Sequence, residues 1–182
     1  DRAGSFYRVE SGALLDSVCS EDGRRWVAGI YRKGALFWAD LGKLPSQSLK
    51  ALTDSIVVQV PVASARSQEA VSIDPLDREV VNWRDRRHLM LMRWGFMLAR
   101  STSVEKLSFF LLELMDGLPA GVPMNLLFTR DEIGDHLGLT SETVTRTITL
   151  LQNDGLIRAH GKWVTIIDRD GLMGRAAQIY ST

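Results

Sequence analysis

The sequence is short of the residues that build disulfides and metal centres. Its 182 residues include one cysteine and three histidines. The single Cys19 excludes an internal disulfide, and one thiol cannot hold an iron–sulfur cluster alone. No stretch approaches the roughly 18 uninterrupted apolar residues of a membrane span. We therefore expect a cytoplasmic protein with no membrane partner and no iron–sulfur cluster.

The few potential metal ligands are also badly spaced. Cys19, His88, His136 and His160 match no usual metal or haem site, so we expect neither group. An alternative reading is a small-molecule-binding barrel protein or enzyme of cupin type, with the helical half used for oligomerisation. Such an enzyme needs clustered histidine and carboxylate ligands in its barrel. Residues 1–72 contain no histidine, so we expect a protein that is not an enzyme.

The sequence has no excess charge of either sign. Its 22 basic and 22 acidic residues give a net charge of zero. This balance argues against a general polyanion binder, but a local basic face is enough for a specific one. The hydrophobic fraction of 45% is enough for one or two packed domains. The chain opens abruptly in DRAGSFYRVESG, which reads like the middle of a domain, so we expect that more chain precedes it.

The most informative stretch runs from Thr129 to Trp163 and predicts a helix-turn-helix. Thr129 followed by Glu132 fits a capping box, in which each side chain satisfies a backbone N–H of the other residue. We expect Gly134 to lie where the two helices cross, because a larger side chain would hold them apart. Gly138 permits the sharp turn that follows.

The second helix of this pair is capped by Thr140. Val144, Ile148 and Leu151 form its inward stripe at helical spacing. The residues left facing outward have chemistry suited to reading bases: arginine bonds guanine, glutamate accepts from cytosine, and threonine touches a thymine methyl. The predicted DNA contacts are Ser141, Glu142, Thr143, Thr145 and Arg146, with Thr129, Arg130 and Lys162 beside them. A helix pair used only for packing is the alternative.

A two-stranded wing is predicted directly after this helix pair. Gly155 ends the second helix. Leu156 to Ala159 and Trp163 to Ile167 are two short apolar or alternating runs. The turn His160-Gly161-Lys162 joins them, and Lys162 at its tip is placed to meet a phosphate. The whole stretch is typical of a winged helix-turn-helix, which places one helix in the major groove.

The first third of the chain predicts β-structure between residues 6 and 60. Ala13 to Ser20 and Arg25 to Tyr31 are strands joined by Glu21-Asp22-Gly23-Arg24, a DG hairpin turn. Ser55 to Val60 is a further strand. Short strands at this spacing indicate a barrel or roll, although the visible strands are too few to close one. We therefore expect an incomplete barrel over residues 1–72.

A long helix is expected over residues 73–98, with Asp74 as its cap and Pro75 at its first position. Its apolar residues recur at alternating spacings of four and three, which is a heptad seam with one polar break at Arg87. This favours a homodimer, with an ordinary core stripe as the alternative. The predicted dimer interface is Leu76, Val80, Trp83, Arg87, Met90, Trp94 and Met97.

Shorter helices are expected on either side of this long one. Ser64 to Val71 predicts a connecting helix. Thr102 with Glu105 is a second capping box, which begins a helix with an apolar face. Gly121 to Leu127 reads as a turn and short strand, and residues 169–180 as a terminal helix. Residues 99–182 are thus expected to form the DNA-binding domain, and the fold class is α+β.

The stretch TRDEIGDHLGLTSETVTRTITLLQNDGLI resembles the DNA-binding segment of the CRP/FNR bacterial transcription regulators. Their recognition helix carries a Glu-x-x-Ser/Gly-Arg pattern, matched here by Glu142, Thr145 and Arg146. The resemblance is closer to the FNR and FixK branches than to the cyclic-AMP branch, because the latter has an arginine where this chain has Ser141. It implies a palindromic site of the TTGAT…ATCAA type, with Thr145 in place of the usual serine.

The resemblance extends to YRVESGALL, EDGRRWVAGIYRKGALF and KALTDSIVVQVP, which are similar to the family's jelly-roll sensor domain. Cyclic-nucleotide-binding members carry a glutamate near Ala39 and a phosphate-gripping arginine near Pro45. A proline has neither charge nor N–H, so the comparison argues against cyclic-nucleotide binding. The family implies a homodimer that activates promoters by touching RNA polymerase, although some members repress. The resemblance does not identify the signal that is sensed.

Overall fold

The computed structural model describes residues 5–39, 47–60, 75–115, 118 and 121–180. The chain divides into two compact units, Asp1–Leu91 and Met92–Thr182. The division falls inside the long helix α1, Pro75–Arg100, so this helix contributes residues to both units. The predicted α+β class is confirmed, and so is the long helix expected over residues 73–98.

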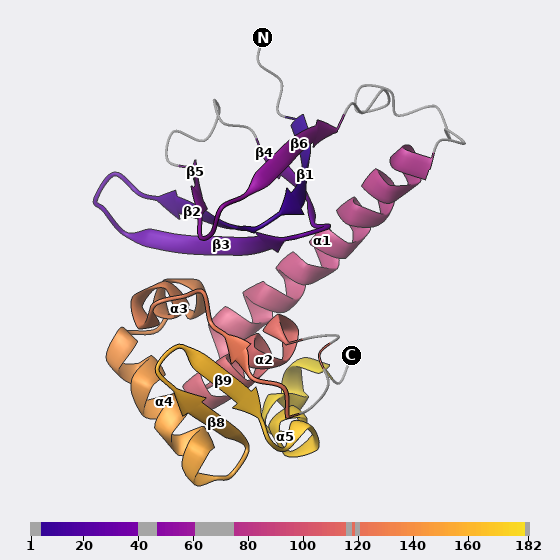
Figure 1. The fold of residues 1–182 in the computed structure, drawn as a ribbon. Coiled ribbons are helices and arrows are strands. Elements are labelled where there is room, and N and C mark those ends of the chain that lie inside the picture. Colours follow the sequence, from indigo (N-terminus) through magenta and orange to yellow (C-terminus); the bar gives the residue numbers. More distant parts are fainter. Residues whose placement is uncertain (1–4, 40–46, 61–74, 116–117, 119–120, 181–182) are drawn as a thin grey trace. The chain divides into compact units, whose positions relative to one another are not determined.

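The described part of the first unit contains two small antiparallel sheets (Figure 1). Strands β1, β4 and β6 form one sheet in the order β4-β1-β6, and β2, β3 and β5 form the other in the order β3-β2-β5. Their bounds are Ser5–Ser11 (β1), Ala13–Cys19 (β2), Arg25–Arg32 (β3), Leu36–Ala39 (β4), Gln47–Ala51 (β5) and Ile56–Val60 (β6). The three strands that the sequence predicts are β2, β3 and β6.

The two sheets share one apolar core. Val9 from β1 and Phe37 from β4 pack with Leu14 from β2 and Tyr31 from β3. The Phe37 ring stacks on Tyr31 at a centroid distance of 4.4 Å. Side chains of both sheets therefore meet in the same interior, as in a sandwich or barrel.

A carboxylate lies inside this core. Asp16 on β2 is 3% exposed, and it accepts hydrogen bonds from the Tyr31 hydroxyl and from Gln47 Nε2, each at 3.1 Å. Burial, and then the neighbouring Asp16, raise the pKa of Tyr31 well above its ordinary value. The Tyr31 phenol therefore keeps its proton and donates a hydrogen bond to Asp16. This bond reduces the free-energy cost of burying the Asp16 side chain.

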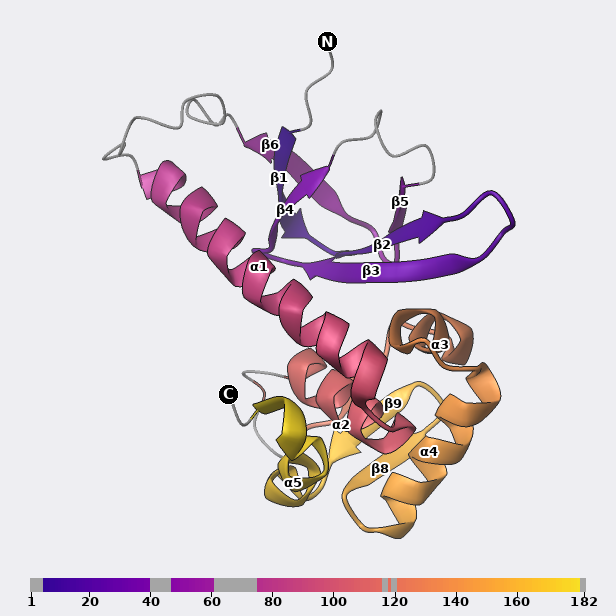
Figure 2. The same ribbon diagram turned by 180° about the vertical axis from the view of Figure 1, so that it is seen from behind.

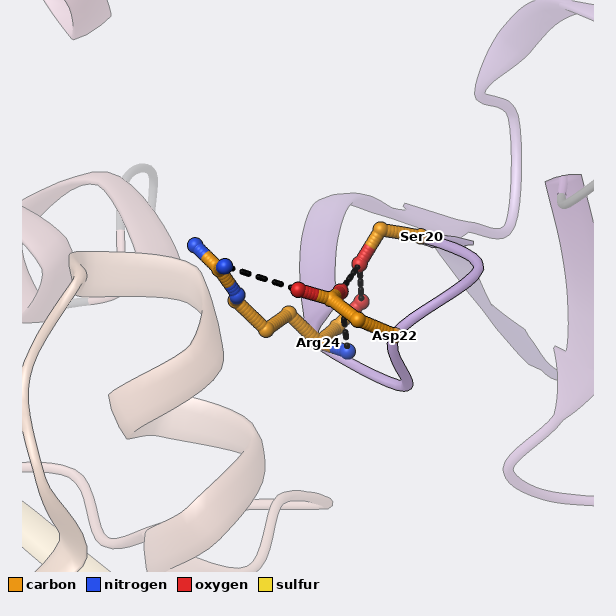
Figure 3. Close-up of polar contacts among 3 residues, drawn as sticks. All are labelled: Ser20, Asp22 and Arg24. Atoms are coloured by element: carbon orange, nitrogen blue, oxygen red, sulfur yellow. Dashed lines mark hydrogen bonds and ion pairs between the residues drawn. The ribbon is translucent and has the colours of Figure 1, made fainter.

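The predicted DG hairpin between β2 and β3 is confirmed, and Asp22 organises its turn (Figure 3). Its carboxylate accepts a hydrogen bond from the Ser20 hydroxyl and forms an ion pair with Arg24 at 2.7 Å. The Ser20 hydroxyl, followed by the Arg24 N–H, lowers the pKa of Asp22. Gly23 has a φ of +84°, a conformation that glycine adopts without strain.

One face of α1 packs against its own chain. In the first unit, Val80 packs with Phe6 and Leu36, and the Trp83 ring meets Phe6 edge-on at 5.1 Å. In the second unit, Trp94 and Met97 are 7% and 0% exposed. The predicted seam is therefore occupied by intrachain contacts at these positions, as expected for a core stripe. Arg87 on the same face is half-buried.

The opposite face of α1 carries exposed apolar side chains. Val81, Leu89, Met92 and Phe96 are between 48% and 66% exposed. Their spacings of eight, three and four residues place them on one stripe of a helix. Rotation by 100° per residue puts this stripe about half a turn from Val80 and Trp94. The helix thus has an apolar face that its own chain contacts and, opposite to it, an exposed stripe of apolar side chains in which Asp85 lies between Val81 and Leu89.

The second unit surrounds the helix α2, Ser103–Leu114, which lies beside α5, Arg169–Tyr180 (Figures 1 and 2). Its predicted capping box is present, with Thr102 and Glu105 bonded in both directions. Seven consecutive residues of α2, 106–112, are buried. The strands β7 (Met124–Asn125), β9 (Trp163–Ile166) and β8 (Ile157–His160) form a three-stranded antiparallel sheet in that order.

Some predictions fall on residues that the structure does not describe. They are the connecting helix over Ser64 to Val71, the cap at Asp74, and Pro45. The side chain of Leu76 also lies outside the described part. Among the helices that are described, none has the length and apolar character needed to cross a membrane.

Candidate nucleic-acid interface

The helix α3, Arg130–Leu137, begins at the predicted capping box. The Glu132 N–H donates to Thr129 Oγ1 at 3.1 Å, and the Thr129 N–H donates to Glu132 Oε2 at 2.9 Å. Glu132 is 4% exposed. These reciprocal bonds satisfy two orphan N–H groups and fix the residue at which the helix starts.

Two glycines shape the turn that follows α3. Gly138 ends the helix with a φ of +63°, as predicted. A Cβ added to Gly134 would lie 2.5 Å from the carbonyl oxygen of Leu139. The sequence predicts that Gly134 lets the two helices approach closely at their crossing. The structure shows that the nearest atom to an added Cβ is the Leu139 carbonyl oxygen, which belongs to the turn between the helices.

The helix α4, Ser141–Asn153, presents the predicted inward stripe. The Thr143 N–H donates to Thr140 Oγ1 at 3.2 Å, which confirms Thr140 as the cap. Val144, Ile148 and Leu151 are 5% exposed or less. Thr147 is buried with them, and its hydroxyl donates to the Thr143 carbonyl at 2.7 Å. The N-terminal end of α4 is thus fixed by its cap and its buried side, while the opposite side of the helix is exposed to solvent.

An open pocket lies where the starts of α3 and α4 meet. It is lined by Arg130, Asp131, Ser141, Glu142, Thr145 and Arg146. Five of these six are residues that the sequence predicts to contact DNA. Glu142, Thr145 and Arg146 are exposed. The structure therefore brings arginine, glutamate and threonine side chains to one surface, which is the donor and acceptor set that major-groove recognition uses.

The side chains of this pocket are partly engaged by their own helix. The Thr145 hydroxyl donates to the Ser141 carbonyl at 2.9 Å, which leaves its methyl group for an apolar contact. Arg146 Nη2 lies 3.5 Å from Thr143 Oγ1, a distance at which a hydrogen bond is weak. Most of the N–H donors of Arg146 therefore remain available to a ligand. Thr143 contacts the Arg146 guanidinium but does not itself line the pocket.

Arg130 also reaches the wing. Its Nη2 donates to the Gly161 carbonyl at 3.3 Å, and Gly161 has a φ of +58° in the wing turn. Burial lowers the pKa of Arg130, although a guanidinium remains charged in proteins. The Leu126 N–H donates to the Lys162 carbonyl at 2.7 Å. The wing turn is thus bonded to the start of α3 and to the segment preceding it.

The remaining predicted contacts lie beside the pocket. Thr129 is the cap of α3, and Lys162 is exposed in the wing turn. Asp131 also lines the pocket and is not among the predicted DNA contacts. Its position in the first turn of α3 is the signal for it, because that turn points toward the start of α4.

No metal centre is assembled by the residues that the structure describes. No group of three or more histidine, cysteine, aspartate or glutamate side chains there is close enough to hold an ion. Cys19 is half-buried at the end of β2. His136 is 5% exposed, and its ring lies 4.1 Å from that of Trp94. Its contacts are thus those of a core residue in the second unit.

Comparisons with known proteins agree with this geometry. Residues 105–175 match a family model described as the Crp-like helix-turn-helix domain. The transcriptional activator protein FnrA of Stutzerimonas stutzeri is 30% identical over 97% of this chain and 74% of its own length. The nitrogen fixation regulation protein FixK of Rhizobium meliloti is 29% identical over 83% of this chain and 68% of its own. The structure of FixK2 from Bradyrhizobium japonicum superposes with a TM-score of 0.77 at 26% identity, covering 96% of this chain and 88% of that one.

Proposed function

This chain belongs to the CRP/FNR family of transcription regulators, and we propose that it reads a TTGAT…ATCAA-like palindrome as a homodimer. As a member of this family it is a DNA-binding regulator and not an enzyme. The observation that supports the sequence preference is the pocket between α3 and α4, where Glu142, Thr145 and Arg146 lie together and exposed. Ser141 takes the position at which the cyclic-AMP branch has a further arginine.

A binding assay tests the proposed site directly. The full chain is titrated against a duplex carrying TTGAT…ATCAA and against a scrambled duplex of equal length and composition. We expect at least about 10³-fold tighter binding to the palindrome, as is usual for specific DNA binders. Both titrations are made at the same salt concentration, because phosphate contacts make affinity depend strongly on salt. Equal affinity for the two duplexes would overturn the proposed specificity.

We propose activation as the regulatory outcome, through contact with RNA polymerase in the cytoplasm. The relative FnrA is described as a transcriptional activator, which supports activation over repression. We also propose that the chain works without a bound cyclic nucleotide. Ala39, near the family's ribose-binding glutamate, is a buried core residue of β4, and its methyl group offers nothing to a ribose hydroxyl.

For the dimer contact, we propose the exposed face of α1. Three residues of the seam inferred from the sequence, Val80, Trp94 and Met97, are buried in their own units, whereas Met90 is 37% exposed. The opposite stripe of Val81, Leu89, Met92 and Phe96 remains exposed. Burying it against a second copy removes apolar surface from water, at roughly 25 cal/mol per Å². Two recognition helices about 34 Å apart then read the two arms of a palindrome.

A charge placed in this stripe is expected to weaken the dimer. For Met92→Glu we expect the dimer dissociation constant to rise at least about tenfold, because a carboxylate would be desolvated in an apolar contact. Arg93→Glu is the matched control, since it adds an acidic residue at an exposed neighbouring position outside the stripe. Sedimentation equilibrium measures both. An unchanged dissociation constant for Met92→Glu would place the interface elsewhere.

A further inference from the structure

The wing carries a large apolar side chain in water. Trp163 is the first residue of β9 and is 51% exposed. The next residue, Val164, and then Ile166 are 0% and 2% exposed. Because side chains alternate along a strand, Trp163 lies on the face opposite to these core residues. Val164 and Ile166 are therefore buried in the core of the second unit, whereas about half of the Trp163 side chain is exposed to solvent.

The surroundings of Trp163 carry basic groups. It follows Lys162, which is exposed in the wing turn, and it pairs across the strands with His160, which is also exposed. Arg158 on β8 is exposed two residues before His160. An indole near the charges of Lys162 and Arg158 suits a polyanion with apolar edges better than it suits an apolar protein surface, where these charges would be desolvated.

The position of the wing turn is tied to the candidate reading pocket. Arg130 lines that pocket and also donates to the Gly161 carbonyl in the turn, two residues before Trp163. A second bond, from the Leu126 N–H to the Lys162 carbonyl, holds the other side of the turn at 2.7 Å. A duplex that enters the pocket therefore passes along a surface continuous with the wing.

We propose that Trp163 packs its indole against the deoxyribose backbone of the DNA, beside a phosphate that Lys162 contacts. This inference rests on the proposed function only in that the chain binds duplex DNA, and it does not depend on the palindrome. Sugar C–H groups offer the apolar surface that an indole can cover, and contacts to the sugar fix the register without carrying sequence information. The electron-rich face of the indole interacts favourably with C–H groups but not with phosphate. Trp163 therefore contacts the sugar, and Lys162 contacts the phosphate.

The salt dependence of binding separates the two residues. The full chain and the variants Trp163→Ala and Lys162→Ala are titrated at several salt concentrations against the palindromic and the scrambled duplex. For Trp163→Ala we expect roughly tenfold weaker binding to both duplexes, as for uncovering part of one aromatic ring. The slope of log K against log salt should stay that of the wild type, because no phosphate contact is lost. For Lys162→Ala the slope should fall by about one per protomer.

Two further variants separate the loss of the aromatic contact from a loss of stability. Trp163→Phe should retain most of the affinity because it keeps an aromatic ring. Trp163→Thr serves as the second truncation if the alanine variant has a lower melting temperature, since threonine suits an exposed strand position. Binding by well-folded Trp163→Ala or Trp163→Thr at the wild-type affinity would overturn the proposal. So would a reduced salt slope, or a loss confined to the palindrome.

The two duplexes distinguish this proposal from the proposed function. If the wild type binds both duplexes equally, the sequence preference fails, but the effect of Trp163 can still be measured on either. If the wild type prefers the palindrome while Trp163→Ala binds like the wild type, the wing contact alone is refuted.

Discussion

Replacing Arg146 with alanine should weaken binding to the palindromic duplex by about 5- to 150-fold, which corresponds to about 1–3 kcal/mol for one lost bidentate contact to a base. Arg146 is exposed in the second turn of α4 and lines the pocket. Its one described hydrogen bond, to Thr143, is 3.5 Å long. The guanidinium thus has little intramolecular interaction to lose, so the expected loss is that of the contact with DNA.

Selectivity is the decisive measurement for this variant. Binding of Arg146→Ala to the scrambled duplex should change little, so the preference for the palindrome should shrink with the affinity. Arg158→Ala is the matched control, because it removes an exposed arginine from β8 outside the pocket. It should affect the two duplexes equally. Fluorescence anisotropy at fixed salt gives all four constants, and equal losses for Arg146→Ala on both duplexes would remove its base-reading role.

Adding a single methyl group to Gly134 should damage both the fold and DNA binding. The new Cβ would lie 2.5 Å from the Leu139 carbonyl oxygen, and the Leu139 N–H already donates to the Gly134 carbonyl at 2.9 Å. Neither group can move without shifting the turn. We expect Gly134→Ala to lower the free energy of unfolding by about 1–3 kcal/mol and to misplace the start of α4 relative to α3.

The control for this prediction is Gly174→Ala in α5. A Cβ there meets no atom of the described residues within 4 Å, so alanine should stabilise the helix by roughly 0.5–1 kcal/mol. Denaturant unfolding of the two variants, with the titration of the palindrome, shows whether the cost is local to the helix-turn-helix. A Gly134→Ala protein with wild-type stability and affinity would mean that the turn can relax at no cost.

Local signals explain why so much of the site was predictable. Each capping box links residues three apart, and the turns at Gly138 and Gly23 depend on the conformation of one glycine. Helical periodicity likewise identified Val144, Ile148 and Leu151 as the buried stripe of α4. These features are decided within a few residues, so a single sequence contains the information for them.

The missed features depend on contacts between distant parts of the chain. Strand β1 pairs with β6 some 50 residues later, and its alternating polar residues gave no separate strand signal. Periodicity also identified an apolar face on α1, but it does not reveal what covers that face. Phe6 and Leu36 cover it at Val80, and those contacts come from strands about 40 and 70 residues away.

The place where α1 meets the second unit decides how that unit can be cut out. A fragment beginning at residue 99, the boundary suggested by the sequence, would lack Trp94 and Met97. The ring of His136 would lose its neighbour at 4.1 Å, and the buried volume of a whole methionine would be empty. Cavities of that size are strongly destabilising. The smallest DNA-binding fragment that retains its core therefore begins at or before Met92, inside the long helix α1.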